Sequence, residues 1–292
     1  MRAPKRSSSP SPAGSYPIST GTLEVEADPY RENSWVLSVN GVPSSHLCLD
    51  DPLALEFEYM RWIAAALESY VPAHLDITRL RVTHLGGAGC SLARWCAARW
   101  PSSRNTVVEF DAQLAALVRE LFDLPRAPQL KIRASEAREV IARARPASRD
   151  IVIRDVFAGA RTPRHVCTAE FAKEVAASLS EAGLYVLNCG DHADLEGAAA
   201  EIATVGAVFP SVGVIADPPM LKGRRYGNII ILGAKRPLPG EGSPEAAQLM
   251  KSLLGGAVPA RYVPGDQLPR RLRGGEVWHD EPASDDSGAE DA

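Results

Sequence analysis

From about residue 80 to residue 234 the chain alternates short apolar runs with stretches in which apolar residues recur every three or four positions. Runs of consecutive apolar residues, such as 151–153 within the strand expected at residues 151–156, are typical of strands that are buried on both faces, whereas the three- and four-residue spacing is typical of helices. Repeated β-α units fold into a parallel sheet with helices on both faces. This pattern therefore predicts an α/β protein in which ligands bind beyond the carboxyl ends of the strands.

The individual elements follow from the same pattern. Thr168 is a good N-cap and predicts where one of the helices begins. Residues 212–216 and 228–234 are joined by a turn without a helical pattern, which predicts a C-terminal antiparallel hairpin. We expect strands at residues 80–85, 106–110, 151–156, 184–188, 212–216 and 228–234, and helices around residues 92–100, 114–121, 137–144, 168–179 and 195–205.

The region before the alternating units predicts a small β region and a bridging helix. Residues 23–26 alternate apolar and acidic side chains, and residues 35–39 run into Asn40-Gly41, a dipeptide that favours a two-residue hairpin turn. Asp50-Asp51-Pro52 is a suitable helix start, and the following apolar residues, Tyr59 among them, fall on one helical face.

Both ends of the chain predict disorder. Residues 1–20 are rich in Ser and Pro, and residues 276–292 are rich in acids with little apolar surface to bury. The predicted organisation is therefore a disordered tail (1–20), a β-hairpin region with a bridging helix (21–70), a Rossmann-like domain (71–240), a C-terminal extension (241–275) and an acidic disordered tail (276–292).

Composition narrows the functional classes. The chain has 292 residues with 32 Lys and Arg against 36 Asp and Glu, a net charge of −4, and no basic stripe with interleaved aromatic residues, which disfavours nucleic-acid binding. No run approaches the roughly 18 apolar residues that a membrane-spanning helix needs, and no signal peptide is apparent, so we expect a soluble cytoplasmic protein without a membrane partner. The five cysteines form no C-x-x-C pair and the histidines no spaced ligand set, so we expect buried thiols and no metal.

A glycine-rich turn carries the strongest functional signal. Residues 85–91 lie between a predicted strand and a predicted helix and include Gly86, Gly87 and Gly89, which allow close approach of a ligand to the backbone. Glu109 ends the next strand, where a carboxylate accepts hydrogen bonds from both hydroxyls of a ribose. The turn departs from G-x-G-x-x-G and no phosphate-binding loop of the type G-x-x-x-x-G-K-[ST] is present, so we expect an adenosyl ligand.

Three segments of this region resemble the spermidine synthase family, aminopropyltransferases built on the adenosylmethionine-dependent methyltransferase fold. Residues 86–89 match the family's glycine-rich turn, residues 106–111 match its V-V-E-I-D strand, and residues 150–155 match the strand that ends in its catalytic Asp. The resemblance implies a Rossmann-like, doubly wound, mostly parallel seven-stranded sheet. It also implies ribose binding by Glu109 and a catalytic role for Asp155.

Weaker matches extend the resemblance. Residues 132–140 are similar to V-x-x-G-D-A-R-E-F, which implies that Glu136 holds the adenine amino group. Residues 56–59 are similar to E-F-x-Y, which places Tyr59 at the pocket, where it either closes the site or only packs. The resemblance further implies a homodimer.

The chain also departs from the family pattern. The family's turn is G-G-G-D-G, and Gly89 stands in place of the Asp. The family continues S-S/T-D-P after its catalytic Asp, whereas Asp155 is followed by Val156-Phe157-Ala158. A cationic polyamine needs several carboxylates to offset its desolvation. Most of these carboxylates are missing here. The loop at residues 161–165 is basic and offers a site for a carboxylate-bearing ligand, or is simply solvated.

Three functions remain open, because one fold hosts all of them. The first is a spermidine synthase-like transferase that uses decarboxylated S-adenosylmethionine to alkylate an amine acceptor. The second is a methyltransferase that uses intact S-adenosylmethionine. The third is a catalytically silent, nucleoside-binding homodimeric scaffold. We expect a transferase of the first two kinds, with Asp155 taking the proton of the nucleophile.

Overall fold

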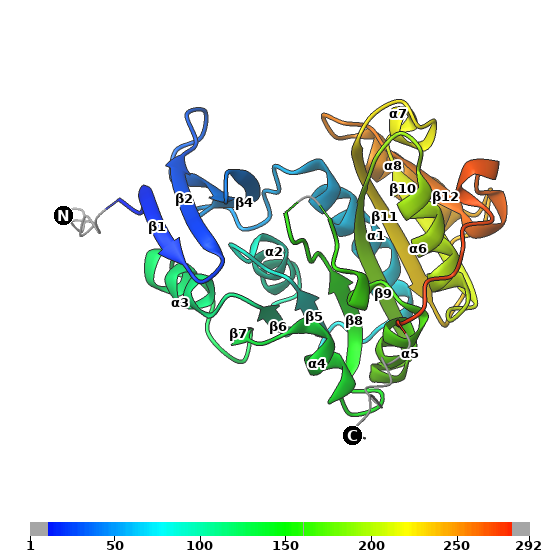
Figure 1. The fold of residues 1–292 in the computed structure, drawn as a ribbon, viewed down its shortest axis with the longest axis horizontal. Coiled ribbons are helices and arrows are strands. Elements are labelled where there is room, and N and C mark those ends of the chain that lie inside the picture. Colours follow the sequence, from blue (N-terminus) through cyan, green and yellow to red (C-terminus); the bar gives the residue numbers. More distant parts are fainter. Residues whose placement is uncertain (1–10, 160, 282–292) are drawn as a thin grey trace, which may run out of the picture.

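The computed structural model describes residues 11–159 and 161–281 and shows a large twisted sheet with helices on both faces and a small separate sheet at the N-terminus (Figure 1). The large sheet has eight strands in the order β12-β10-β11-β9-β8-β5-β6-β7. The pairs formed by β5 with β6 and β8, by β6 with β7 and by β8 with β9 are parallel. The strands are β5 (Arg81–Leu85), β6 (Arg104–Glu109), β7 (Leu130–Ala134), β8 (Arg149–Arg154), β9 (Leu179–Asp191), β10 (Ser211–Ala216), β11 (Gly227–Ala234) and β12 (Arg261–Pro264).

This sheet confirms the predicted mostly parallel α/β architecture, and the antiparallel pairing of β10 with β11 confirms the C-terminal hairpin. The predicted absence of a helix between these two strands is wrong, because the four-residue α7 (Pro218–Leu221) forms there, capped by the Asp217 side chain. The predicted number of strands, seven, is wrong. The eighth strand, β12, lies in the predicted C-terminal extension and pairs antiparallel with β10. Its four residues, Arg-Tyr-Val-Pro, are too short to show a period of two in the sequence.

The helices cover the two faces in the way that the strand side chains require. Ile151 and Ile153 of β8 face a core with α1, α2 and α8, whereas Val152 between them faces a core with α4, α5 and α6. Thr168 caps α5 as predicted, its hydroxyl accepting from the Phe171 N–H at 3.3 Å. The helices are α1 (Glu58–His74), α2 (Ser91–Arg99), α3 (Ala112–Leu121), α4 (Ala137–Ala142), α5 (Ala169–Ser178), α6 (Glu196–Gly206), α7 (Pro218–Leu221) and α8 (Pro244–Leu254), with 3-10 turns η1 (Arg164–Val166), η2 (Gly265–Gln267) and η3 (Arg270–Leu272).

The N-terminal sheet is an antiparallel meander of β1 (Gly14–Ile18), β2 (Gly21–Ala27), β3 (Ser34–Val39) and β4 (Val42–Cys48). Asn40 and Gly41 both have positive φ between β3 and β4, which confirms the predicted tight hairpin. The predicted disorder of residues 1–20 is wrong where β1 forms. Its backbone pairs with β2, and Thr20 donates to the Asp111 carboxylate from its N–H and its hydroxyl, so tertiary contacts order a segment whose Ser and Pro content alone disfavours structure. Residues 1–10 lie outside the described residues.

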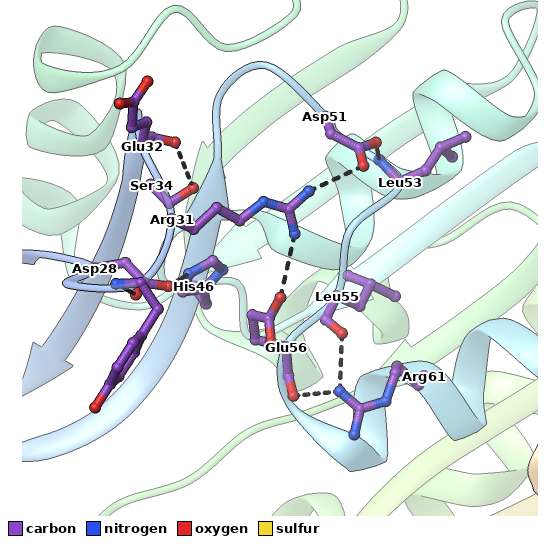
Figure 2. A network of polar contacts seen from close by, with 11 residues as sticks. Asp28, Arg31, Glu32, Ser34, His46, Asp51, Leu53, Leu55, Glu56 and Arg61 are labelled. Atoms are coloured by element: carbon purple, nitrogen blue, oxygen red, sulfur yellow. Dashed lines mark hydrogen bonds and ion pairs between the residues drawn. The ribbon is translucent and has the colours of Figure 1, made fainter. Parts of the chain in front are cut away.

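The bridging helix begins later than Asp50-Asp51-Pro52 predicts. Asp51 instead forms a turn, its carboxylate accepting from the Leu53 N–H at 3.1 Å and from Arg31 at 3.2 Å. Figure 2 shows Arg31 between Asp51 and Glu56, and Arg61 of α1 donating to the carbonyls of Leu55 and Glu56. These contacts fasten the N-terminal sheet to the start of α1.

The C-terminal segment is ordered farther than predicted. The Ala169 N–H donates to the Trp278 carbonyl at 2.7 Å, and the Trp278 N–H donates to the Thr204 hydroxyl at 2.9 Å. Asp280 accepts from both Nη atoms of Arg138 at 2.7 and 2.6 Å. The predicted tail of residues 276–292 is therefore wrong for residues 276–281, and residues 282–292 lie outside the described ones.

Within the described ranges, no helix is long and apolar enough to cross a membrane. The five cysteines are buried and unpaired by disulfides, as predicted.

Candidate active site

The glycine-rich turn after β5 lies directly against the end of β8. The Gly86 N–H donates to the Val108 carbonyl of β6 at 2.9 Å, and the Asp155 N–H donates to the Leu85 carbonyl at 2.8 Å. Gly86 has a φ of +79°, and a Cβ placed on it would lie 2.2 Å from the Asp155 carbonyl oxygen. Only glycine fits here, because any side chain would push the two strand ends apart.

Glu109 holds the same turn from the neighbouring strand. One carboxylate oxygen, Oε2, accepts from the N–H groups of Gly87 and Ala88 at 3.3 and 3.1 Å, and Oε1 accepts from the Asp111 N–H at 3.1 Å. The side chain is half-buried. A carboxylate has about four acceptor positions, so Glu109 keeps room for a hydroxyl donor while it stabilises the turn. The structure thus brings the predicted turn and acid into contact.

Asp155 ends β8 with both carboxylate oxygens held. Tyr59 of α1 donates its hydroxyl to Oδ2 at 2.9 Å, and the Asn188 amide of β9 donates to Oδ1 at 3.0 Å. Burial raises the pKa of Asp155, although the hydrogen bonds from Asn188 and Tyr59 partly oppose this shift. Burial, together with the Asp155 charge, raises the pKa of Tyr59 well above its usual value, so the phenol stays protonated and donates. The result is a fixed carboxylate that binds a proton more readily than an exposed Asp does.

Asn188 is a site residue that the sequence did not indicate. It is buried in β9, and its Oδ1 has no hydrogen-bond partner among the residues that the structure describes. A buried polar atom without a partner is unusual in a protein interior. The signal in the sequence is one amide within the apolar run of residues 184–189 of β9, the strand next to the one that Asp155 follows.

Gly89 faces protein. Its N–H donates to the Ser45 hydroxyl at 2.9 Å, and a Cβ on Gly89 would lie 2.9 Å from the Ser45 Cβ and 3.0 Å from the Leu37 Cδ2. The glycine therefore lets the N-terminal sheet close over the turn. A contact of Gly89 with a ligand stays a prediction.

Glu136 lies apart from the Asp155 cluster, at the N-terminus of α4. Its Oε2 accepts from the Glu139 N–H at 2.8 Å as a helix cap, and its Oε1 contacts the His165 ring at 3.0 Å. Arg164 lies over the Trp278 ring at 3.9 Å. Two side chains of the basic loop thus contact protein groups, and adenine binding by Glu136 stays a prediction.

Two cavities lie elsewhere, and neither is lined by a predicted site residue. One, of about 360 Å³, lies between α1 and α8 next to Arg61 and Lys251. The other, of about 540 Å³, lies beside α6 and β10. No group of three or more His, Cys, Asp or Glu side chains within residues 11–159 and 161–281 is arranged to hold a metal ion.

Comparisons with known proteins place this site in a family. A solved structure described as a probable spermidine synthase from Corynebacterium glutamicum is 51% identical, covers 93% of this chain and 98% of its own, and superimposes with a TM-score of 0.90. This chain belongs to the spermidine synthase family. The spermidine synthase from Thermotoga maritima shares the fold at a TM-score of 0.57 and 16% identity over 76% of this chain and 72% of its own.

The more distant relatives include an aminopropyltransferase and a methyltransferase. A polyamine aminopropyltransferase from Neisseria meningitidis is 29% identical over 145 residues, 49% of this chain and 53% of the relative, so the match spans about half of that relative's length. An N-terminal histidine N-methyltransferase from Emericella nidulans is 27% identical over 136 residues, 45% of this chain and 24% of the relative. No family model matches the chain.

Proposed function

We propose that this member of the spermidine synthase family is a transferase that alkylates an amine acceptor with an adenosyl sulfonium donor, decarboxylated S-adenosylmethionine. The partly buried carboxylate of Asp155 carries the proposal. It is held by Tyr59 and Asn188 beside the glycine-rich turn and Glu109. The family membership supports the same reaction.

The donor binds at the end of β5 and β6. Gly86 and Gly87 leave room for the backbone to approach it, and Glu109 accepts from its ribose hydroxyls. Glu136 receives the adenine amino group. This placement directs the carbon on the donor's sulfonium sulfur towards Asp155, because the end of β8 adjoins the turn.

The acceptor enters as an ammonium and loses one proton to Asp155. Its nitrogen lone pair then attacks the carbon on the sulfonium sulfur, a C–N bond forms, the C–S bond breaks and its electron pair stays on sulfur. The products are the alkylated amine and neutral methylthioadenosine. Burial makes Asp155 a better proton acceptor, and Tyr59 and Asn188 hold its carboxylate in line.

A second candidate is methyl transfer from intact S-adenosylmethionine to a nitrogen nucleophile. The likeness to the Emericella N-methyltransferase favours it. The same pocket serves both reactions, since they differ in which group on the sulfonium is attacked.

We further propose that the protein is cytoplasmic and forms a homodimer. Its acceptor is a small molecule, and it needs no metal, nucleic acid or membrane for its activity. The composition supports the location and the absence of these partners, and the family resemblance supports the dimer. Analytical ultracentrifugation tests the dimer.

Two variants test the division of roles between donor binding and chemistry. Glu109→Ala is expected to weaken methylthioadenosine binding at least about tenfold in calorimetric titration, because the ribose loses its carboxylate. Asp155→Asn is expected to leave that affinity within about twofold of wild type and to lower kcat at least about a hundredfold. Equal loss of binding in both variants would remove Asp155 from catalysis.

The choice of donor is tested with the wild-type protein. Affinities for methylthioadenosine, intact adenosylmethionine and its decarboxylated form are compared by calorimetry. Preference for the decarboxylated form supports aminopropyl transfer, preference for the intact form supports methyl transfer, and absence of binding by all three contradicts both.

A further inference from the structure

Aromatic side chains gather around Gly190, close to the end of β9. A Cβ on Gly190 would lie 3.0 Å from the Tyr226 hydroxyl oxygen and 3.3 Å from the Phe157 ring. The His192 ring packs on Tyr226 with centroids 5.0 Å apart. Phe157 and Tyr226 are 37% and 48% exposed, which leaves apolar faces of the two rings uncovered. The absence of a side chain at Gly190 lets the two rings approach the strand.

This aromatic cluster of Phe157, His192 and Tyr226 lies next to the Asn188 side chain that contacts the catalytic carboxylate of Asp155. Gly190 follows Asn188 by two residues in β9, so the two positions share a face of the strand and lie about 6–7 Å apart. Asn188 contacts Asp155 at 3.0 Å, and Phe157 follows Asp155 by two residues. An amine held at Asp155 therefore has its distal atoms beside the cluster.

The charged side chains directly before His192 and Tyr226 in the chain, Asp191 and Arg225, already have partners. The Asp191 carboxylate accepts from the N–H groups of His192 and Ala198 at 2.8 and 2.7 Å. Arg225 forms an ion pair with Asp217 at 2.6 Å. A second ammonium at this point would find aromatic faces and an imidazole instead of the carboxylate of Asp191, whereas a hydrocarbon tail would cover apolar surface.

We propose that Phe157 and Tyr226 form the subsite for the distal part of the acceptor, and that the acceptor is a primary amine with an apolar or aromatic tail instead of a second ammonium. This inference rests on the proposed function, because it places the reacting nitrogen at Asp155. It assigns the acceptor class partly to Phe157, which stands where the family pattern has Ser or Thr, next to Ala158 in place of the family's second Asp.

The test compares 2-phenylethylamine with 1,4-diaminobutane as acceptors for decarboxylated adenosylmethionine. Wild-type kcat/KM is expected to be at least about tenfold higher for phenylethylamine. Phe157→Ala is expected to lower kcat/KM about tenfold for phenylethylamine, chiefly through KM, and less than about twofold for the diamine. Tyr226→Phe keeps the ring and is expected to behave as wild type, whereas Tyr226→Ala loses affinity for phenylethylamine.

Leu254→Ala is the matched control, because Leu254 is 57% exposed on α8 and belongs to neither site. This variant is expected to leave kcat/KM unchanged for both phenylethylamine and the diamine. A wild-type preference for the diamine, or an unchanged acceptor ratio in Phe157→Ala, overturns the subsite.

Binding separates this inference from the proposed reaction. Phenylethylamine and the diamine are titrated calorimetrically into protein saturated with methylthioadenosine. If no amine is alkylated, the proposed function fails, but phenylethylamine that binds wild type and is weakened by Phe157→Ala still supports the subsite. Absence of phenylethylamine binding, or equal affinity in wild type and Phe157→Ala, overturns it.

Discussion

Glu201→Gln is expected to be strongly destabilising, because it leaves a charge alone in the core. Arg154 and Glu201 are 0% and 4% exposed, and they form an ion pair beneath the site, between β8 and α6. The Arg154 Nη1 also donates to the Val166 carbonyl at 3.0 Å and the Cys167 Sγ at 2.8 Å. Its Nε has no partner among the residues described. Glu201 is thus the only carboxylate with which Arg154 forms an ion pair in the described part of the chain.

The expected cost follows from burial. Removing one partner of a buried ion pair costs about 3–5 kcal/mol, because the remaining charge is neither hydrated nor paired. The Gln amide oxygen still accepts one hydrogen bond, which places Glu201→Gln near about 3 kcal/mol. At about 2–4 °C per kcal/mol for a chain of roughly this size, the melting temperature falls by about 6–12 °C.

Urea unfolding followed by circular dichroism measures the free energy of unfolding. Glu174→Gln is the control, because Glu174 faces Arg138 at 3.7 Å in a partly exposed pair and is expected to cost at most about 1 kcal/mol. The double variant Arg154→Met, Glu201→Met replaces both charges with apolar groups and is expected to recover most of the loss. A cost below about 1 kcal/mol for Glu201→Gln, or a double variant as unstable as the single one, refutes the reasoning.

Three further predictions concern the site and its surroundings. Gly89→Ala is expected to cost about 1–3 kcal/mol of unfolding free energy, because its Cβ meets the N-terminal sheet; unchanged stability in urea unfolding would contradict this. Burial raises the pKa of Asp155 above 3.8, and the reaction uses the ionised carboxylate. In steady-state assays kcat/KM is therefore expected to rise with pH through a midpoint above 3.8. A midpoint at or below 3.8 would argue against Asp155 as the base. Trp278→Ala removes the contact with Arg164 and apolar packing and is expected to cost about 1–3 kcal/mol by thermal unfolding, whereas a tail without packing would show no change.

The sequence predicted those parts of the fold in which local chemistry and tertiary structure agree. The apolar run of β8 needs burial on both faces, and the sheet supplies it. Asn40-Gly41 favours positive φ, and the hairpin uses it. The glycine-rich turn and Glu109 were both predicted at the carboxyl ends of successive strands, and these strands are parallel neighbours whose ends meet.

Other features depend on contacts between distant residues and were missed for that reason. β1 is ordered by pairing with β2 and by Asp111, although its own sequence is poor in apolar residues. β7 has only one buried residue, Leu130, and shows no strong pattern. Glu136 precedes a helix, and a carboxylate at that position serves as a cap or as a ligand group without any difference in the sequence.

Packing against the N-terminal sheet explains why one of the family's carboxylates is missing at the glycine-rich turn. The resemblance places an Asp of the family's turn at the position of Gly89, but a Cβ there would lie 2.9 Å from the Ser45 Cβ and 3.0 Å from the Leu37 Cδ2. An acid at this point would therefore force β3 and β4 away from the turn. Because Arg94 of α2 also donates to the Cys48 carbonyl at 3.1 Å, such a shift would break a second contact of the same sheet. The N-terminal sheet can therefore pack this closely on the turn only because residue 89 has no side chain. Gly89→Asp alone is expected to destabilise the protein before it improves binding of a cationic ligand.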